Sequence, residues 1–261
     1  MGSGLSCLIA GSKSTNGPSL LVQHDSQEPI ERSNFFRFWI LFGSSQRPWK
    51  VEEWEEVSDS VRGGKSYASM VLIEPFNQIS GVRFVGDLDS ETLGGAGFAS
   101  RVYRLNPKDS IGIDDRFDSF FLETRPIEDK ASVVNRFTLL VKGDGSTDQE
   151  EKHMAEHQSP MSSVVYEFDF EVPTSLIDSN QDFIRVNIPF DSLKPTYRGR
   201  PRPGSKQFDP NKLNELSIMC RSFFNQQSGI FDLQILRIGL CHSEESCRAT
   251  KKVVVAQKKL L

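Results

Sequence analysis

The sequence predicts an all-β fold of the sandwich type. From Ser66 onward, apolar residues recur with a period of two, in short runs that Gly, Pro, Asn and Asp interrupt. Short strands separated by frequent turns are typical of β-sandwiches. No stretch keeps the 3.6-residue period of a long amphipathic helix. The chain has 261 residues, of which 37% are hydrophobic and 19 are Phe, enough for a packed core.

The elements are expected in the following order. Residues 1–30 are polar and poor in aromatic residues, so we expect a flexible N-terminal arm. Residues 31–245 form the sandwich domain, whose first segment, Asn34–Phe42, fits either a buried strand or a short helix. A polar insertion between Gly143 and Ser163 is expected to be a surface loop. Residues 246–261 are expected to form a C-terminal tail or an edge strand.

Val164–Val172 is the clearest predicted strand. In it, Phe168 and Phe170 are expected to point inward, while Glu167 and Asp169 face water. The last predicted strand has apolar residues on both faces and is expected to be central in its sheet. Further strands are predicted at Tyr67–Ile73, Val82–Val85, Phe98–Leu105, Ser119–Glu123, Arg136–Lys142, Phe183–Pro189, Glu215–Cys220 and Phe231–Ile238.

Composition excludes several classes of protein. Lys and Arg number 31 against 35 Asp and Glu, a net charge of −4, and the two signs are interspersed. This pattern argues against nucleic-acid binding. The apolar stretches are too short and too often interrupted by charge to form a transmembrane segment. Four cysteines without paired spacing, and no N-x-[ST] glycosylation acceptor, indicate a reducing compartment.

Catalytic, metal and cofactor motifs find little support. His153 and His157 lie four residues apart beside Glu156, but the order differs from HExxH, so we interpret them as a solvated pair and assign no metal. Residues 64–66 read Gly-Lys-Ser, like the end of a P-loop, yet Asp59 replaces the first glycine and no predicted strand precedes. With no nucleophile elbow either, we predict a non-enzyme without a cofactor.

Two loops carry the candidate partner-binding residues. The first follows Trp54 and combines charged side chains with a Gly-Gly pair, which is typical of a recognition loop or of a tight turn leading into a strand. The second, Phe190–Gly204, is stiffened by prolines and rich in Arg, and is expected to be an extended loop able to bind a carboxylate or phosphate, or a solvated surface loop. The candidates are Asp59, Arg62, Gly63, Gly64, Lys65 and Ser66 in the first loop, and Arg198, Gly199 and Arg200 in the second.

An ordered set of motifs resembles the complex I intermediate-associated protein 30 family over about residues 35–240. The motifs are Trp54, Asp59, Val61, Gly63, Gly64 and Ser66; Phe84–Gly86; Gly94, Gly95, Gly97, Phe98 and Ala99; Gly143–Gly145; Pro189–Gly199; and Gly229, Phe231 and Leu233. The resemblance implies a galactose-binding-domain-like jelly roll. It also implies a non-catalytic assembly factor for respiratory complex I, located in mitochondria, whose partners are complex I assembly intermediates.

Two alternatives stay open. Jelly rolls also bind carbohydrates and small ligands, so a ligand-binding module is the second reading of function. The N-terminus is a poor mitochondrial presequence, with only Lys13 positive before Arg32. It fits a myristoylation pattern at Gly2, with Cys7 as a palmitoylation candidate. Peripheral association with the cytosolic face of a membrane, or a cytoplasmic location, is therefore the second reading of location.

Overall fold

Two antiparallel sheets pack into a β-sandwich in the computed structural model, as the sequence predicts. The structure describes residues 38–76, 79–105, 117–125, 134–143, 164–173, 183–197 and 199–242. These residues all belong to the second of two units in the chain, which begins at Phe36. The predicted N-terminal arm and the two lipidation candidates lie outside the described residues. So do the polar insertion, the histidine pair and residues 246–261.

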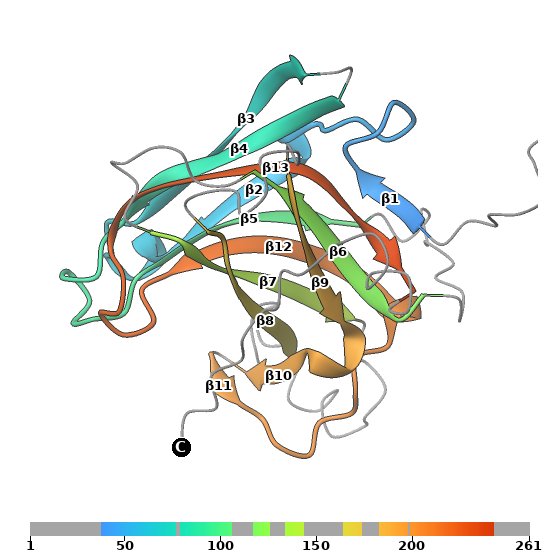
Figure 1. Ribbon diagram of the computed structural model, residues 1–261. Coiled ribbons are helices and arrows are strands. Elements are labelled where there is room, and N and C mark those ends of the chain that lie inside the picture. The colour runs from blue at the N-terminus through green and yellow to red at the C-terminus, as the bar shows by residue number, and fades with distance from the viewer. Residues whose placement is uncertain are drawn as a thin grey trace, which may run out of the picture. The chain divides into compact units, whose positions relative to one another are not determined.

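The strands are shared between a six-stranded and a seven-stranded sheet, which Figure 1 shows as two layers. The first has the order β3 (Tyr67–Phe76), β4 (Ile79–Leu88), β13 (Gly229–Cys241), β6 (Ser119–Thr124) and β9 (Ile184–Pro189), with β1 (Phe38–Phe42) also paired to β13. The second has the order β11 (Arg200–Pro201), β10 (Lys194–Tyr197), β8 (Val165–Glu171), β7 (Arg136–Gly143), β12 (Leu213–Arg221), β5 (Phe98–Arg104) and β2 (Trp54–Ser58). Short 3-10 turns are η1 (Val51–Glu53), η2 (Asp59–Arg62), η4 (Phe190–Ser192) and η5 (Pro210–Lys212).

The hydrophobic core lies between the two sheets. On β12, Leu216, Ile218 and Cys220 are fully buried and alternate with residues of the opposite face, as a strand with one inward face requires. Their neighbours in register on β7 include Leu139 and Phe137, which are also fully buried. Burying these continuous rows of large side chains is the main favourable term in the stability of the sandwich.

Every strand predicted from the period of two is present, and β1 resolves the first aromatic segment as a strand. The sequence missed three strands, however. The statement that no strand precedes Gly64 was wrong, because β2 leads directly into η2. The proline-rich segment predicted as an extended loop contains β10 and β11, an edge hairpin in which proline needs no ladder hydrogen bond.

Strand β13 is central in its sheet, as predicted. It pairs with β4 along its first half and with β6 and β1 along its second. Its side chains do not alternate uniformly, because the register shifts between Ile235 and Arg237. After that bulge Ile238 faces the core and Arg237 faces away from it, which a uniform period of two does not predict.

The face of the six-stranded sheet that points away from the core holds a buried cluster of charged residues. Glu123 is 1% exposed and accepts hydrogen bonds from Arg185 and, at 3.0 Å, from Arg237. The Arg185 guanidinium lies 4.8 Å and 4.7 Å from the ring centroids of Phe38 and Phe121. These contacts tie β1, β6, β9 and β13 together on the side of the sheet opposite the core.

Candidate functional site

Asp59 is the centre of the first predicted loop, and its carboxylate is fully buried. Its Oδ1 accepts the backbone N–H of Ser66 at 3.0 Å. Its Oδ2 accepts the Ser66 hydroxyl at 2.6 Å and the backbone N–H of Phe98 at 3.1 Å. Gly64 must lack a side chain, because a Cβ there would lie 2.2 Å from Asp59 Oδ1. The carboxylate therefore closes the loop on itself and fastens it to β5.

The same loop is joined to the loop that follows β4. The backbone N–H of Asp89 donates to Ser66 Oγ at 3.0 Å, and the Ser66 hydroxyl lies 3.2 Å from the Asp89 carbonyl oxygen. Gly97 packs so closely there that a Cβ would lie 2.0 Å from that carbonyl oxygen. The Thr92 backbone N–H, assisted by the Lys65 charge, lowers the pKa of the Asp89 carboxyl. Loops 59–66 and 89–97 thus form one hydrogen-bonded end of the sandwich, hereafter the loop end.

The predicted partner-binding residues fall into two groups. Asp59, Gly64 and Ser66 hold the loop end together, whereas Arg62 and Lys65 are exposed. Gly63 is exposed too and has a φ of +83°, a conformation that favours glycine. In the second loop, Gly199 and Arg200 are exposed on the β10–β11 hairpin, and Arg198 lies outside the described residues.

The structure does not bring the two predicted loops together. Loop 59–66 follows β2, one edge of the seven-stranded sheet, and β11 forms the other edge. Five strands separate them, which corresponds to roughly 29 Å at about 4.8 Å per strand. A molecule that touched both loops would therefore have to span the width of the sheet.

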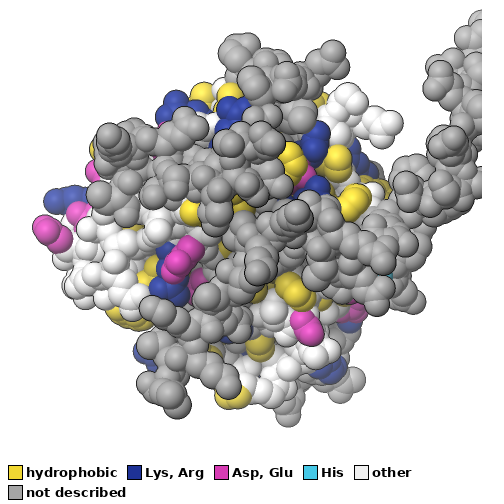
Figure 2. Space-filling model, viewed as in Figure 1, with side chains coloured by type: hydrophobic (Ala, Val, Ile, Leu, Met, Phe, Trp, Pro, Cys, Tyr) yellow, Lys and Arg dark blue, Asp and Glu magenta, His cyan; other side chains and the backbone are white. Residues whose placement is uncertain are grey.

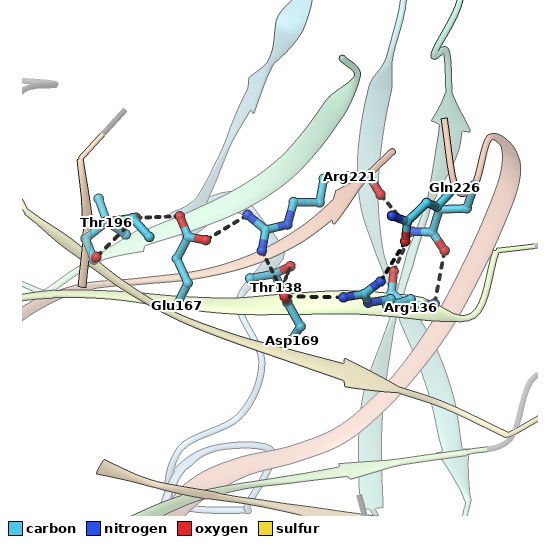
Figure 3. Close-up of polar contacts among 9 residues, drawn as sticks. Arg136, Thr138, Glu167, Asp169, Thr196, Arg221 and Gln226 are labelled. Carbon is cyan, nitrogen blue, oxygen red and sulfur yellow. Dashed lines mark hydrogen bonds and ion pairs between the residues drawn. The ribbon is translucent and has the colours of Figure 1, made fainter. Parts of the chain in front are cut away.

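A network of charged residues occupies the outward face of the seven-stranded sheet (Figure 3). Arg221 on β12 donates from Nη1 to Glu167 Oε2 at 2.7 Å and from Nη2 to Asp169 Oδ1 at 2.6 Å. Thr196 donates to the other oxygen of Glu167 at 2.6 Å, and Thr138 donates to Asp169 at 2.8 Å. The side chain of Glu167 is only 10% exposed, so these bonds replace the water that it loses.

Arg136 extends the network to loop 222–228, which joins β12 to β13. Its Nη2 lies 3.6 Å from Asp169 Oδ2, and its Nη1 donates to Gln226 at 3.1 Å. Gln227 donates from Nε2 to the Arg136 carbonyl oxygen at 2.7 Å. The Arg136 guanidinium also lies 3.7 Å from the ring centroid of Phe223. Figure 3 shows the hydrogen bonds and ion pairs of the network as one chain from Thr196 to Gln226.

Loop 222–228 is strained. Phe223, Phe224 and Asn225 have φ values of 46°, 56° and 65°, a run of left-handed residues in which none is glycine. Such conformations cost about 1–2 kcal/mol for each residue, because the Cβ atom crowds the next carbonyl. Strain of this kind is kept where surrounding contacts fix it, and it clusters at functional sites. The loop is therefore part of the candidate site.

Cations and aromatic rings alternate from the loop end to this network. Arg62 lies 5.4 Å from the ring centroid of Phe98, and Phe98 pairs in register with Arg221. The Arg221 guanidinium lies 4.7 Å from the ring centroid of Phe223, which also contacts Arg136. The candidate site is thus one continuous region that joins the loop end, the charged network and loop 222–228.

Most charged groups of this region are bonded within the protein. Both carboxylates of the network are engaged by arginine and threonine, while Arg221 Nε is buried without a hydrogen-bond partner. Across the described residues, no group of three or more His, Cys, Asp or Glu side chains could hold a metal ion. On the face seen in Figure 2, the described basic, acidic and hydrophobic side chains are interspersed.

Sequence reasoning missed most of the network. Glu167 and Asp169 were expected to face water, but Arg221, Thr138 and Thr196 from three other strands neutralise or bond them. Only the strand register brings these residues together, and a period of two does not give the register between strands. The Ser-Phe-Phe-Asn sequence of the strained loop carries no glycine that marks a left-handed turn.

Comparison with known sequences finds a family model and a relative that cover the same part of the chain. The family model for complex I intermediate-associated protein 30 (CIA30) matches residues 40–235. An uncharacterized protein of Schizosaccharomyces pombe is 36% identical over 197 residues, covering 74% of this chain and 80% of the relative. Both matches span most of the described sandwich.

Comparison with solved structures matches a carbohydrate-binding module. The family 11 carbohydrate-binding module of the cellulosomal cellulase Lic26A-Cel5E of Clostridium thermocellum has a TM-score of 0.47 and 14% sequence identity. It covers 73% of this chain and 88% of its own. The β-sandwich itself is shown by the strand order of the two sheets.

Proposed function

The chain belongs to the complex I intermediate-associated protein 30 family, and from this premise we propose that it is a non-catalytic assembly factor that binds protein intermediates of respiratory complex I. The match over residues 40–235 carries the proposal. The residues that hold the loop end, Asp59, Gly64, Ser66 and Gly97, belong to the motifs by which the chain resembles the family. A frame that fixes the positions of the loops supports a role in binding.

Partner contact is assigned to the loop end. Arg62 and Lys65 are exposed there, on a frame that Asp59 fixes, so the loop backbone loses little conformational entropy on binding. Gly199 and Arg200 provide a second contact region at the far edge of the same sheet. Asp59, Gly63, Gly64 and Ser66 act by positioning the loop.

Deletion of the gene tests the proposal directly. We expect mature complex I, measured on native gels, to fall in the deletion strain and to return with the wild-type chain. The double variant Arg62→Ala/Lys65→Ala should restore it poorly. Lys50→Ala/Lys212→Ala is the matched control, because it removes two positive charges at the other ends of β2 and β12. Normal complex I in the deletion strain would contradict the proposal.

The mitochondrion is the proposed location, by family membership. The alternative is the cytosolic face of a membrane through acylation of Gly2 and Cys7, and fractionation of a C-terminally tagged chain decides between them. Protease-protected signal in mitochondria for both the wild type and Gly2→Ala supports the proposal. Signal on other membranes that becomes soluble in Gly2→Ala supports acylation instead.

Binding of a carbohydrate or another small polar ligand is the second candidate function. The observation that favours it is the buried, unpartnered Arg221 Nε beside the Phe223 ring, since a donor next to an aromatic face can bind a hydroxyl group. A glycan array and a thermal-shift screen test it with the purified chain. We expect Arg221→Met to abolish any shift that the wild type shows, and an absence of shifts would remove this candidate.

A further inference from the structure

The strained backbone of loop 222–228 holds one large apolar side chain, that of Phe224, exposed to solvent. Phe224 is 84% exposed and lies in the middle of the three left-handed residues. A phenyl ring in water is unfavourable, and a left-handed backbone is unfavourable for a residue with a Cβ atom. Because neither feature stabilises the fold, their coincidence at Phe224 indicates a function for this side chain.

The surrounding contacts keep the loop in this conformation from both sides. Ser222 donates two hydrogen bonds to the loop end. Its N–H donates to the Gly97 carbonyl at 2.9 Å, and its hydroxyl donates to the Gly95 carbonyl at 2.7 Å. On the other side, Gln227 Nε2 donates to the Arg221 carbonyl at 2.7 Å. Phe223 lies against two guanidinium groups. Phe224 is therefore presented from a fixed backbone.

We propose that Phe224 is a preformed aromatic anchor that inserts into an apolar pocket on a partner protein. The inference rests on the proposed function as far as that function is the binding of a protein. Aromatic side chains held in their bound conformation are typical of the few residues that dominate the affinity of an interface, because little rotational freedom is left to lose.

The surroundings of Phe224 favour a protein over a sugar or a lipid surface. Most polar groups of the network are already bonded to one another, and the unpartnered Arg221 Nε is buried, which leaves few groups for the hydroxyls of a sugar stacked on this ring. Insertion into lipid requires several apolar residues beside a basic cluster. Here Asn225 and Gln226, which are exposed and polar, follow the ring directly.

Photocrosslinking in living cells tests the anchor. The full chain is expressed with p-benzoylphenylalanine at position 224, and a second chain carries it at position 71, where Val71 is 50% exposed on β3. We expect one protein to be crosslinked from position 224 and not from position 71. No crosslink at 224 above the level at 71 overturns the inference. A crosslink to a complex I subunit supports both proposals, and one to an unrelated protein supports the anchor and contradicts the complex I role.

Affinity for the crosslinked protein gives the second measurement. We expect Phe224→Ala to weaken Kd about 30-fold, which equals about 2 kcal/mol, whereas Val71→Ala changes it less than about twofold. The melting temperature of Phe224→Ala should not fall, since the ring is exposed. A loss of affinity below about threefold overturns the anchor. So does an oligosaccharide that raises the melting temperature of the wild type but not of Phe224→Ala, because Phe224 would then bind a sugar.

Discussion

Replacing Asp59 by alanine should destabilise the sandwich strongly, although the residue lies in a loop. The carboxylate is fully buried and accepts three hydrogen bonds, two of them from the backbone N–H groups of Ser66 and Phe98. In Asp59→Ala both N–H groups lose their acceptor, at about 1–3 kcal/mol each. The Ser66 hydroxyl keeps a contact with the Asp89 carbonyl at 3.2 Å. We therefore expect the free energy of unfolding to fall by about 3–4 kcal/mol.

Urea unfolding followed by tryptophan fluorescence measures this loss. Small domains have about 5–15 kcal/mol of stability, so the midpoint should move clearly. Asp59→Asn keeps one acceptor oxygen but places an amide near the Phe98 N–H, and should lose about half as much. Asp87→Ala removes an exposed carboxylate from β4 and should change stability by less than about 0.5 kcal/mol. A loss below about 1 kcal/mol for Asp59→Ala would refute the view that this carboxylate holds the loop end.

Three further changes follow from the same structure. Gly97→Ala should lower the free energy of unfolding by about 2 kcal/mol, because its methyl group meets a backbone carbonyl that cannot move aside; wild-type stability would contradict this. Phe224→Gly should raise it by about 1 kcal/mol by relieving the left-handed strain, and a lower urea midpoint would count against that strain. Burial raises the pKa of the Cys220 thiol well above its ordinary value of 9.0, so its contribution to stability is present below pH 9 and lost at higher pH. With Cys7 and Cys247 replaced by serine, the remaining thiols, both buried, should react with a disulfide reagent at pH 8 no faster than the chain unfolds, and rapid labelling would disprove this.

Local patterning predicted the strands well because each strand buries one face. In β8, Phe168 and Phe170 are 7% and 1% exposed, as the alternation requires. The opposite face was harder, since Glu167 is buried by its pairing with Arg221, 54 residues away in sequence. To predict that a carboxylate on an outward face is buried, one must know which side chains the neighbouring strands place beside it. The sequence does not state which strand is the neighbour.

Partner binding at the two predicted loops stays a prediction, whereas the structure shows how the first loop is built. Arg62 and Lys65 are exposed as a recognition loop requires, whereas Asp59 and Ser66 form the tight turn that was the alternative reading. Loop 222–228 could not be found from sequence. Its left-handed run depends on Ser222 and Gln227 holding the loop from both sides, and nothing in the residue types reveals this.

The place of β13 in the six-stranded sheet has a consequence for synthesis on the ribosome. Strands β1, β4 and β6 all pair with β13, yet all are translated before it. At about 5–20 residues per second, the roughly 140 residues between Leu88 and Gly229 take about 7–28 seconds to translate. Until β13 has been made, the edges of β4 and β6 that pair with it lack their partner, and unpaired edges aggregate readily. The six-stranded sheet therefore cannot complete its strand pairing until β13, the last of the described strands, has been translated.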